Sequence, residues 1–339
     1  MRECTVCRHC FSDEVETCPR DARPTKPTLP IDPFFRRRYR LVKRLGRGRI
    51  SVVYRALDEQ SRTECAIKII LPEYVGNNFK AGHGAFALRH KNIVAVIESG
   101  MSDNVLPFVV MDFIAGPSLE EVLERSGPLT PAAAFEYLKG IGNGLSFAHS
   151  SGVIHGDLKP RNILLVDGLP PAEAIRIADF GLSAIKSGLL RSPLYLAPEE
   201  WSEGHSDARS DIYSVGVILY HMLTGAPPFT GKSNAAIMKS HLRDPIPSIP
   251  ERFPDVTLKL EQVVLHALEK DPDRRPESVE SFVDEFRKVL GSEVVTRQPD
   301  PPAAEQRSST TIQSILLAVG VVLVITLISI GVYYSRLSP

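Results

Sequence analysis

The sequence has no excess of charge of either sign and no internal repeats. The 40 lysines and arginines balance the 40 aspartates and glutamates over 339 residues. A chain without net charge is not drawn as a whole toward nucleic acid or other acidic surfaces, so we expect no nucleic-acid partner. The 43% apolar and 24% charged residues are typical of a globular protein with a substantial core. The length allows one large domain, or two ordinary ones, with appendages.

The N-terminus lacks the apolar run of a secretory signal peptide and is instead polar and rich in cysteine. Four of the five cysteines lie in the first 18 residues, at positions 4, 7, 10 and 18. Without a secretory route, disulfides are disfavoured. The pattern resembles a zinc ribbon, in which two tight turns present ligands to one tetrahedral ion. The fifth cysteine, Cys65, is expected to be a small buried residue.

A zinc ion is expected to hold this segment together, because roughly 25 residues cannot bury enough surface to fold alone. The fourth ligand is open. We prefer Cys10, and the alternatives are His9 beside it and Asp21, which stands where a second turn usually has its last ligand. The three natural thiolate ligands are Cys4, Cys7 and Cys18.

Charged residues are also absent from positions 315–334. A helix of this length spans about 30 Å, the thickness of a bilayer core. Tyr333 and Tyr334 stand where aromatic side chains favour the membrane interface. A buried core helix is the alternative, but such a helix is normally shorter or carries a polar stripe. We therefore expect one transmembrane helix over 314–334, after a polar linker (291–313) and before a short tail (335–339).

Two short motifs in the middle of the chain combine carboxylates, an amide and an ammonium group. They are HGDLKPRN at 155–162 and DFG at 179–181. Asp157 fits the group that accepts a proton from a substrate hydroxyl or orients that hydroxyl, and Lys159 can neutralise charge on the γ-phosphate of ATP. Asn162 and Asp179 offer hard oxygen ligands, which suit Mg²⁺ better than sulfur or imidazole does.

In this order and separation, the motifs resemble the catalytic half of the eukaryotic-like protein kinase family. The resemblance extends over about residues 39–290, roughly three quarters of the chain. It implies an α+β, bilobal fold with a β-rich N-lobe and a helical C-lobe. It also implies that ATP and Mg²⁺ are required and that the γ-phosphate is transferred to protein substrates. Lys159 after the catalytic aspartate, with Ser192 in the docking segment, points to serine or threonine as the acceptor.

The first half of this region contains the matching nucleotide-binding pattern. Apolar alternation at 41–45 and 52–54 predicts two strands joined at G-x-G-x-x-S, where Ser51 replaces the family's third glycine. The apolar segment CAIK at 65–68 and another at 107–113, which leads into the link between the lobes, predict two more strands. The resemblance implies an ATP site formed by Gly46, Gly48, Val53, Ala66, Lys68, Met111, Asp112 and Ile114.

The second half shows apolar residues at helical spacing over 131–150 and again from Asp211 to position 223. The first of these helices is expected to carry the catalytic loop. By resemblance, Asp211 braces that loop from beneath, and Arg275 pairs with Glu199. We expect these three residues to stabilise the fold.

Two positions depart from the family pattern. Ala81 stands where the family has the helix glutamate that pairs with the strand lysine, and the nearby Gly82 and Gly84 weaken a helix. Gly156 replaces an arginine that in many kinases binds a phosphorylated activation loop. Three interpretations follow. We favour an active kinase, because the catalytic and metal-binding residues are present. The others are a pseudokinase that binds ATP or a partner as a scaffold, and a zinc-ribbon adaptor with the kinase fold as a spacer.

The whole arrangement resembles bacterial transmembrane serine/threonine kinases. We expect a zinc-ribbon-like module (1–25), a linker (26–38) and a kinase domain (39–290), followed by the linker, transmembrane helix and tail given above. Because ATP and reduced cysteines belong to the cytoplasm, we expect a single-pass membrane protein whose kinase domain is cytoplasmic.

Overall fold

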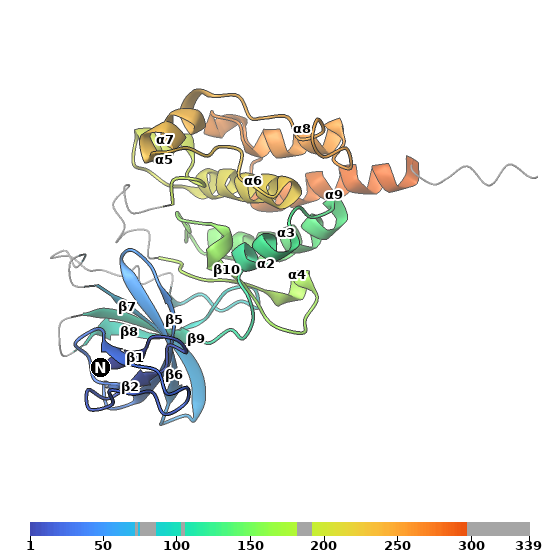
Figure 1. Cartoon of the computed structure of the whole chain (residues 1–339). Coiled ribbons are helices and arrows are strands. Elements are labelled where there is room, and N and C mark those ends of the chain that lie inside the picture. Colours follow the sequence, from blue (N-terminus) through green and yellow to red (C-terminus); the bar gives the residue numbers. More distant parts are fainter. Residues whose placement is uncertain (72–73, 75–85, 103–105, 182–191, 297–339) are drawn as a thin grey trace, which may run out of the picture. The chain divides into compact units, whose positions relative to one another are not determined.

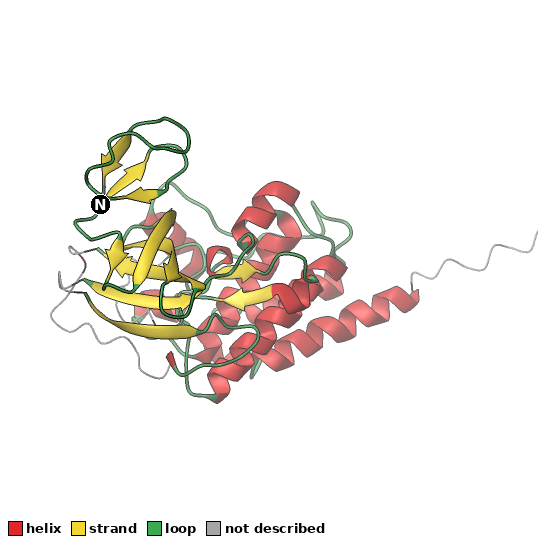
Figure 2. Ribbon diagram, turned by 90° about the horizontal axis from the view of Figure 1, so that it is seen from below, coloured by secondary structure: helices red, strands yellow, loops and turns green. Residues whose placement is uncertain are grey.

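The computed structural model describes residues 1–71, 74, 86–102, 106–181 and 192–296. The chain divides into two compact units, Met1–Leu290 and Gly291–Pro339, each of which is considered by itself. In the first unit most strands precede most helices along the chain (Figure 1). Figure 2 shows most of the strands of this unit in one region and most of the helices in another. This agrees with the predicted β-rich N-lobe and helical C-lobe.

The N-lobe is built on an antiparallel six-stranded sheet with the order β4-β5-β6-β7-β9-β8. The strands are β4 (Phe34–Phe35), β5 (Tyr39–Arg47), β6 (Ser51–Asp58), β7 (Thr63–Ile70), β8 (Val96–Met101) and β9 (Pro107–Asp112). Val52, Tyr54 and Ala56 of β6 are buried at alternate positions, as the period of two in a strand requires. The second half of β7 is buried at every position, which explains why all of its residues except Lys68 are apolar.

A smaller three-stranded sheet, ordered β2-β1-β3, precedes the large one. It consists of β1 (Arg2–Cys4), β2 (Cys10–Phe11) and β3 (Thr25–Pro27). Met1, Leu29 and Ile31 belong to the same apolar cluster as Tyr54 of the large sheet. The segment 26–38, expected to be a separate linker, therefore contains strand residues and packs into the core of the N-lobe. This corrects that expectation.

The helices of the C-lobe surround one apolar core. The longer helices are α2 (Leu119–Ser126), α3 (Pro131–Ser150), α6 (Ala208–Thr224), α7 (Asn234–Arg243), α8 (Leu258–Ala267) and α9 (Val279–Thr296). The short elements are α4 (Pro171–Ala174), α5 (Pro198–Ser202), β10 (Ile163–Leu165), β11 (Ile175–Ile177) and the 3₁₀ turns η2 (Pro160–Asn162) and η5 (Pro272–Arg274). Thr130 caps α3, and Pro131 at its first position favours a helix start. The bounds of α3 are those that the sequence predicts.

In the described part of the chain, no helix is long and apolar enough to cross a membrane. The helix expected over 314–334 lies outside that part, as does the tail after it. Of the expected linker 291–313, only the first six residues are described, and they belong to α9.

Candidate active site

Lys68 lies in the middle of the large sheet and contacts the DFG motif. Its partners in the adjacent strands are Val53 of β6 and Val109 of β9. The side chain is only 7% exposed, and its Nζ lies 2.6 Å from Oδ2 of Asp179. A buried ammonium group requires an anionic partner, and Asp179 provides it. The ion pair joins β7 to a loop 111 residues further along the chain.

Asp179 has an unusual backbone conformation. Its φ is 72°, in the left-handed region that residues other than glycine rarely adopt, and φ of Gly181 is 73°. Such strain persists only where surrounding contacts enforce it, and it is common at functional sites. Phe180 between them is buried against His155, with the two ring centroids 4.8 Å apart.

The loop at 155–162 holds Asp157 in a buried, hydrogen-bonded position. Lys159 Nζ donates to its Oδ2 at 2.9 Å, and the backbone N–H of Ser192 donates to its Oδ1 at 3.1 Å. The N–H of Asp157 itself donates to Nδ1 of His155 at 3.2 Å. Burial lowers the pKa of His155, so the imidazole stays neutral and can accept this bond.

Asn162 connects Asp157 with the DFG motif. Its side-chain Nδ2 donates to the backbone carbonyl oxygen of Asp157 at 2.9 Å, and its backbone carbonyl oxygen accepts the N–H of Ala178, the residue before the motif, at 2.8 Å. A side-chain amide that donates through its nitrogen keeps an oxygen that can bind a metal ion. These bonds link the Asn162 side chain to the backbone of Asp157, and the Asn162 backbone to the residue before Asp179.

An apolar cluster lies between the sheet and these two loops. Its buried members are Ala66, Val94, Val109, Met111 and Ala178, and the side chains packed against them are Val53, Phe86, Val96, Ile114 and Leu164. Four of these residues were expected to line the adenine site: Val53, Ala66, Met111 and Ile114. Leu164 and Ala178 were not anticipated, although each lies within two residues of a motif position, after Asn162 and before Asp179. A small cavity in this cluster reaches Asp179 and Phe180.

Asp112, also expected at the nucleotide site, is placed differently from the apolar residues. It is exposed, and its backbone N–H donates to the carbonyl oxygen of Ala95 at 3.0 Å. This amide is therefore not available to a nucleotide base. A backbone donor for the base has to come from a later residue, such as Ile114.

The glycine-rich hairpin joins β5 and β6. The N–H of Gly48 donates to the carbonyl oxygen of Ser51 at 2.8 Å and closes the turn. A Cβ added to Gly46 would meet no atom within 4 Å, and one added to Gly48 would make only ordinary contacts. The protein's own packing does not require glycine at either position, and the open space allows a ligand to approach the backbone closely.

Asp211 in the first turn of α6 supports the loop at 155–162. Its two carboxylate oxygens accept the backbone N–H groups of His155 and Gly156, each at 2.9 Å, and His149 Nε2 lies 2.8 Å from Oδ2. Burial alone raises the pKa of Asp211, but the hydrogen bonds from His149 and from the backbone N–H of Gly156 help to hold that pKa below its usual value. Gly156 has a φ of 69°, which glycine adopts without strain and which explains glycine where the family pattern has arginine.

Glu199 and Arg275 form a bidentate ion pair, with both N···O distances 2.7 Å. The Arg275 side chain is 0% exposed. It also donates to the carbonyl oxygens of Glu269 and Arg209, and its guanidinium group lies over the ring of Tyr213. The arginine thus fastens the start of α5 to the segment after α8.

Some expected positions lie outside the described residues. Ala81, with Gly82 and Gly84, falls in the range 75–85, and the activation-loop range 182–191 is also not described. The consequence of alanine at the expected glutamate position therefore rests on the sequence alone.

A second cluster of candidate ligands lies in the small sheet and consists of Cys4, Cys7, Cys18 and Asp21. Their ligand atoms all lie within 4.8 Å of one another. The sulfur atoms of Cys7 and Cys18 are 3.7 Å apart. That separation suits two ligands of one tetrahedral zinc ion, given Zn–S bonds of about 2.3 Å.

The two turns that carry these residues are alike. In each turn, the N–H of the residue after the last ligand donates to the carbonyl oxygen of the first ligand, at 3.2 Å for Arg8 and 2.9 Å for Ala22. Both of these residues are left-handed, with φ of 61° and 53°. Asp21 therefore occupies in the second turn the place that Cys7 occupies in the first.

Cys10 is not part of this cluster, which corrects the preference for it as fourth ligand. It lies in β2 and packs against the apolar core of the N-lobe. Its thiol is therefore separated from the four clustered ligand atoms by its place in β2.

Comparison with known proteins decides the family. The model of the protein kinase domain family matches residues 39–286. The chain belongs to the protein kinase domain family. The region matched begins at the first residue of β5 and includes both lobes.

Several bacterial serine/threonine kinases are similar to this kinase-family chain. Serine/threonine-protein kinase PknB of Mycolicibacterium smegmatis is 35% identical over 258 residues, covering 70% of this chain and 40% of the relative. PknB of Mycobacterium leprae is 31% identical over 311 residues, covering 86% and 48%. PrkC of Bacillus subtilis is 32% identical over 270 residues, covering 76% and 41%. The matches thus span less than half the length of these relatives.

Proposed function

We propose that this chain is an ATP-dependent protein serine/threonine kinase. The observation that carries the proposal is the contact between Lys68 and Asp179, next to a network that holds Asp157 and Asn162. The similar bacterial proteins are named as serine/threonine kinases, which supports the same acceptor.

Each of these side chains has a task that its position allows. Lys68 would hold phosphate oxygens, since its ammonium group can exchange one anionic partner for another. Asp157 would orient the substrate hydroxyl or accept its proton, and Lys159, 2.9 Å away, would offset charge on the transferred group. Mg²⁺, for which Asn162 and Asp179 offer oxygens, neutralises phosphate charge when bound. The Lys68 ammonium group lies 2.6 Å from the Asp179 carboxylate, which shows that this carboxylate can hold a cation at its position.

The purified chain, incubated with Mg²⁺ and γ-labelled ATP, is expected to transfer label to serine and threonine of a generic protein acceptor. Phosphoamino-acid analysis identifies the labelled residues. ATP-dependent thermal stabilisation without any transfer would contradict the proposal and favour the scaffold interpretation, for which Ala81 is the sequence argument. Label on tyrosine alone would contradict the choice of acceptor.

We also propose that Cys4, Cys7, Cys18 and Asp21 hold one zinc ion. The matched geometry of the two turns and the clustering of the ligand atoms support this. Asp21→Ala should lower the zinc content, measured by mass spectrometry after dialysis, from about one ion per chain to a small fraction. Cys10→Ser is the control and should keep the metal. The reverse pattern would restore Cys10 as the ligand and exclude Asp21.

We propose further that residues 314–334 anchor the chain in a membrane, with the kinase domain (39–290) and the zinc module (1–25) in the cytoplasm. The support is the uncharged sequence of 315–334. After cell fractionation, the full chain should sediment with membranes, and a chain ending at residue 313 should not. Equal distribution of the two chains would refute the anchor.

A further inference from the structure

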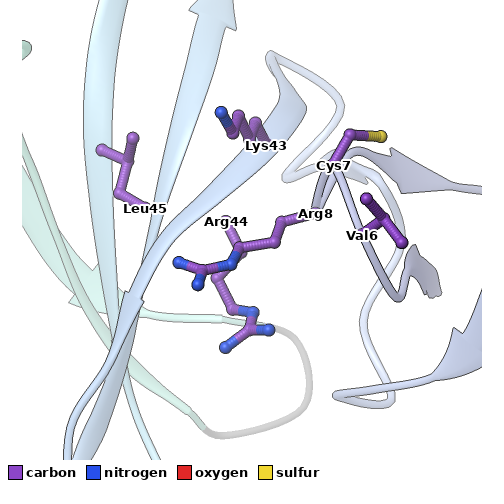
Figure 3. Close-up of a pocket in the computed structure, with 6 residues that line it drawn as sticks. All are labelled: Val6, Cys7, Arg8, Lys43, Arg44 and Leu45. Atoms are coloured by element: carbon purple, nitrogen blue, oxygen red, sulfur yellow. The ribbon is translucent and has the colours of Figure 1, made fainter. Parts of the chain in front are cut away.

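A pocket of about 310 Å³ lies where the first turn of the small sheet meets β5 (Figure 3). It is lined by Val6, Cys7, Arg8, Lys43, Arg44 and Leu45, none of which is acidic. Figure 3 shows the guanidinium groups of Arg8 and Arg44 between the two backbones, while the Cys7 thiol points away from them. We call this the basic pocket.

Backbone contacts fix the two sides of the basic pocket. The N–H of Arg44 donates to the carbonyl oxygen of Arg8 at 2.9 Å, and His9 forms an isolated β-bridge with Lys43. The register of β5 on β6 shifts on both sides of Lys43 and Arg44. Such bulges change the direction of nearby side chains, and here they lie on either side of Lys43 and Arg44, the two cations that β5 contributes to the pocket.

Three of the six residues that line the basic pocket are cations. The buried carboxylate of Glu3 lies 2.6 Å from Nε of Arg44 and also accepts hydrogen bonds from Tyr54 and Thr28. Among the residues that the structure describes, neither Arg8 nor Lys43 has an ion-pair partner. Two cations without an ion-pair partner can offset the charge of −1.5 to −2 that a phosphate monoester carries at neutral pH.

We propose that the basic pocket binds a phosphorylated serine or threonine of a peptide, next to an apolar residue of that peptide. Arginine favours phosphate because its planar N–H groups match the phosphate oxygens. Val6 and Leu45 on the rim are 63% and 38% exposed and offer apolar surface for the neighbouring residue. The concave shape favours a single projecting group over a flat membrane surface.

The basic pocket adjoins the nucleotide site through the chain itself. Leu45 immediately precedes Gly46, so a peptide bound here would contact the strand that leads into the glycine-rich hairpin. This binding site goes beyond the proposed kinase activity and does not require it, because occupancy needs no phosphoryl transfer.

The test uses the full chain in detergent, without ATP, and a fluorescent pool of peptides with a central phosphothreonine and randomised apolar neighbours. Fluorescence anisotropy should show binding of this pool and not of its unphosphorylated counterpart. Arg8→Asn and Lys43→Gln should each weaken binding about tenfold, since each removes a charge-assisted hydrogen bond. Asparagine tolerates the left-handed φ of position 8. Measuring each variant singly, with its melting temperature, separates a folding defect from lost binding.

The matched controls remove the same charges elsewhere. Arg62→Asn changes an exposed arginine with a similar φ of 60°, and Lys239→Gln changes an exposed lysine of α7. Neither should alter binding. The proposal fails if the pool does not bind or if the controls weaken it equally. It also fails if inorganic phosphate competes as well as the peptides, which indicates a small-molecule site. Stronger competition by soluble short-chain phosphatidylserine would indicate a lipid site and overturn it too.

Discussion

Replacing Asp157 with asparagine is expected to lower the rate of phosphoryl transfer to protein by about 10²–10⁴-fold, the usual contribution of a positioned general base. The carboxylate is buried and hydrogen-bonded to Lys159 and to the backbone of Ser192, so the amide keeps the shape but loses the charge. Initial rates with γ-labelled ATP, at saturating ATP, measure the effect. ATP binding, followed by thermal stabilisation, is expected to change little.

Asp167→Asn is the matched control for that variant, because Asp167 is exposed and lies only ten residues further along the chain. Its transfer rate should equal that of the unchanged chain. If Asp157→Asn retained the full rate, Asp157 would have no role as base, and the assignment of the loop at 155–162 would be wrong.

Replacing Arg275 with methionine is expected to lower the free energy of unfolding by about 3–5 kcal/mol, because it leaves a largely buried carboxylate without its partner. Glu199 accepts two hydrogen bonds from Arg275, and the guanidinium group also satisfies backbone carbonyl oxygens on two other segments. Urea unfolding of the purified chain, followed by tryptophan fluorescence and circular dichroism, measures the loss.

The adjacent Arg274 provides the control. It is 74% exposed and 3.8 Å from Asp271, a surface pair that contributes at most about 1 kcal/mol. Arg274→Met should therefore leave the unfolding midpoint nearly unchanged. Adding Glu199→Leu to Arg275→Met should recover part of the lost stability, since the unpaired charge is then gone. An equal loss for the two arginine variants would refute the structural role of Arg275.

The helices and strands that depend on interactions between neighbouring residues could be predicted from the sequence. The helix over 131–150 was found because Thr130 and Pro131 mark its start and apolar residues recur along one face. The strands β5 and β6 were found from apolar alternation and from the turn glycines, and β9 was found from a continuous apolar segment. The motif residues Asp157, Asn162 and Asp179 were found because their spacing is constrained by the chemistry they share.

Contacts distant in sequence were not predictable in the same way. The preference for Cys10 over Asp21 as zinc ligand followed from the residue type alone, whereas the choice depends on which side of β2 faces the N-lobe core. The linker expected at 26–38 is proline-rich, and only its packing reveals that Leu29 and Ile31 are buried. Arg44 and Glu3 are 41 residues apart, so no local sequence pattern predicts their ion pair or the basic pocket beside it.

Crystals of the chain grown with Mn²⁺ and a non-hydrolysable ATP analogue test the central claim most directly, because the anomalous signal of manganese locates the ion. We predict a peak within about 2.0–2.3 Å of side-chain oxygens of Asn162 and Asp179, with Lys68 Nζ moved from Asp179 to a phosphate oxygen. A nucleotide bound without metal at these residues, with the ion pair between Lys68 and Asp179 intact, would contradict the account.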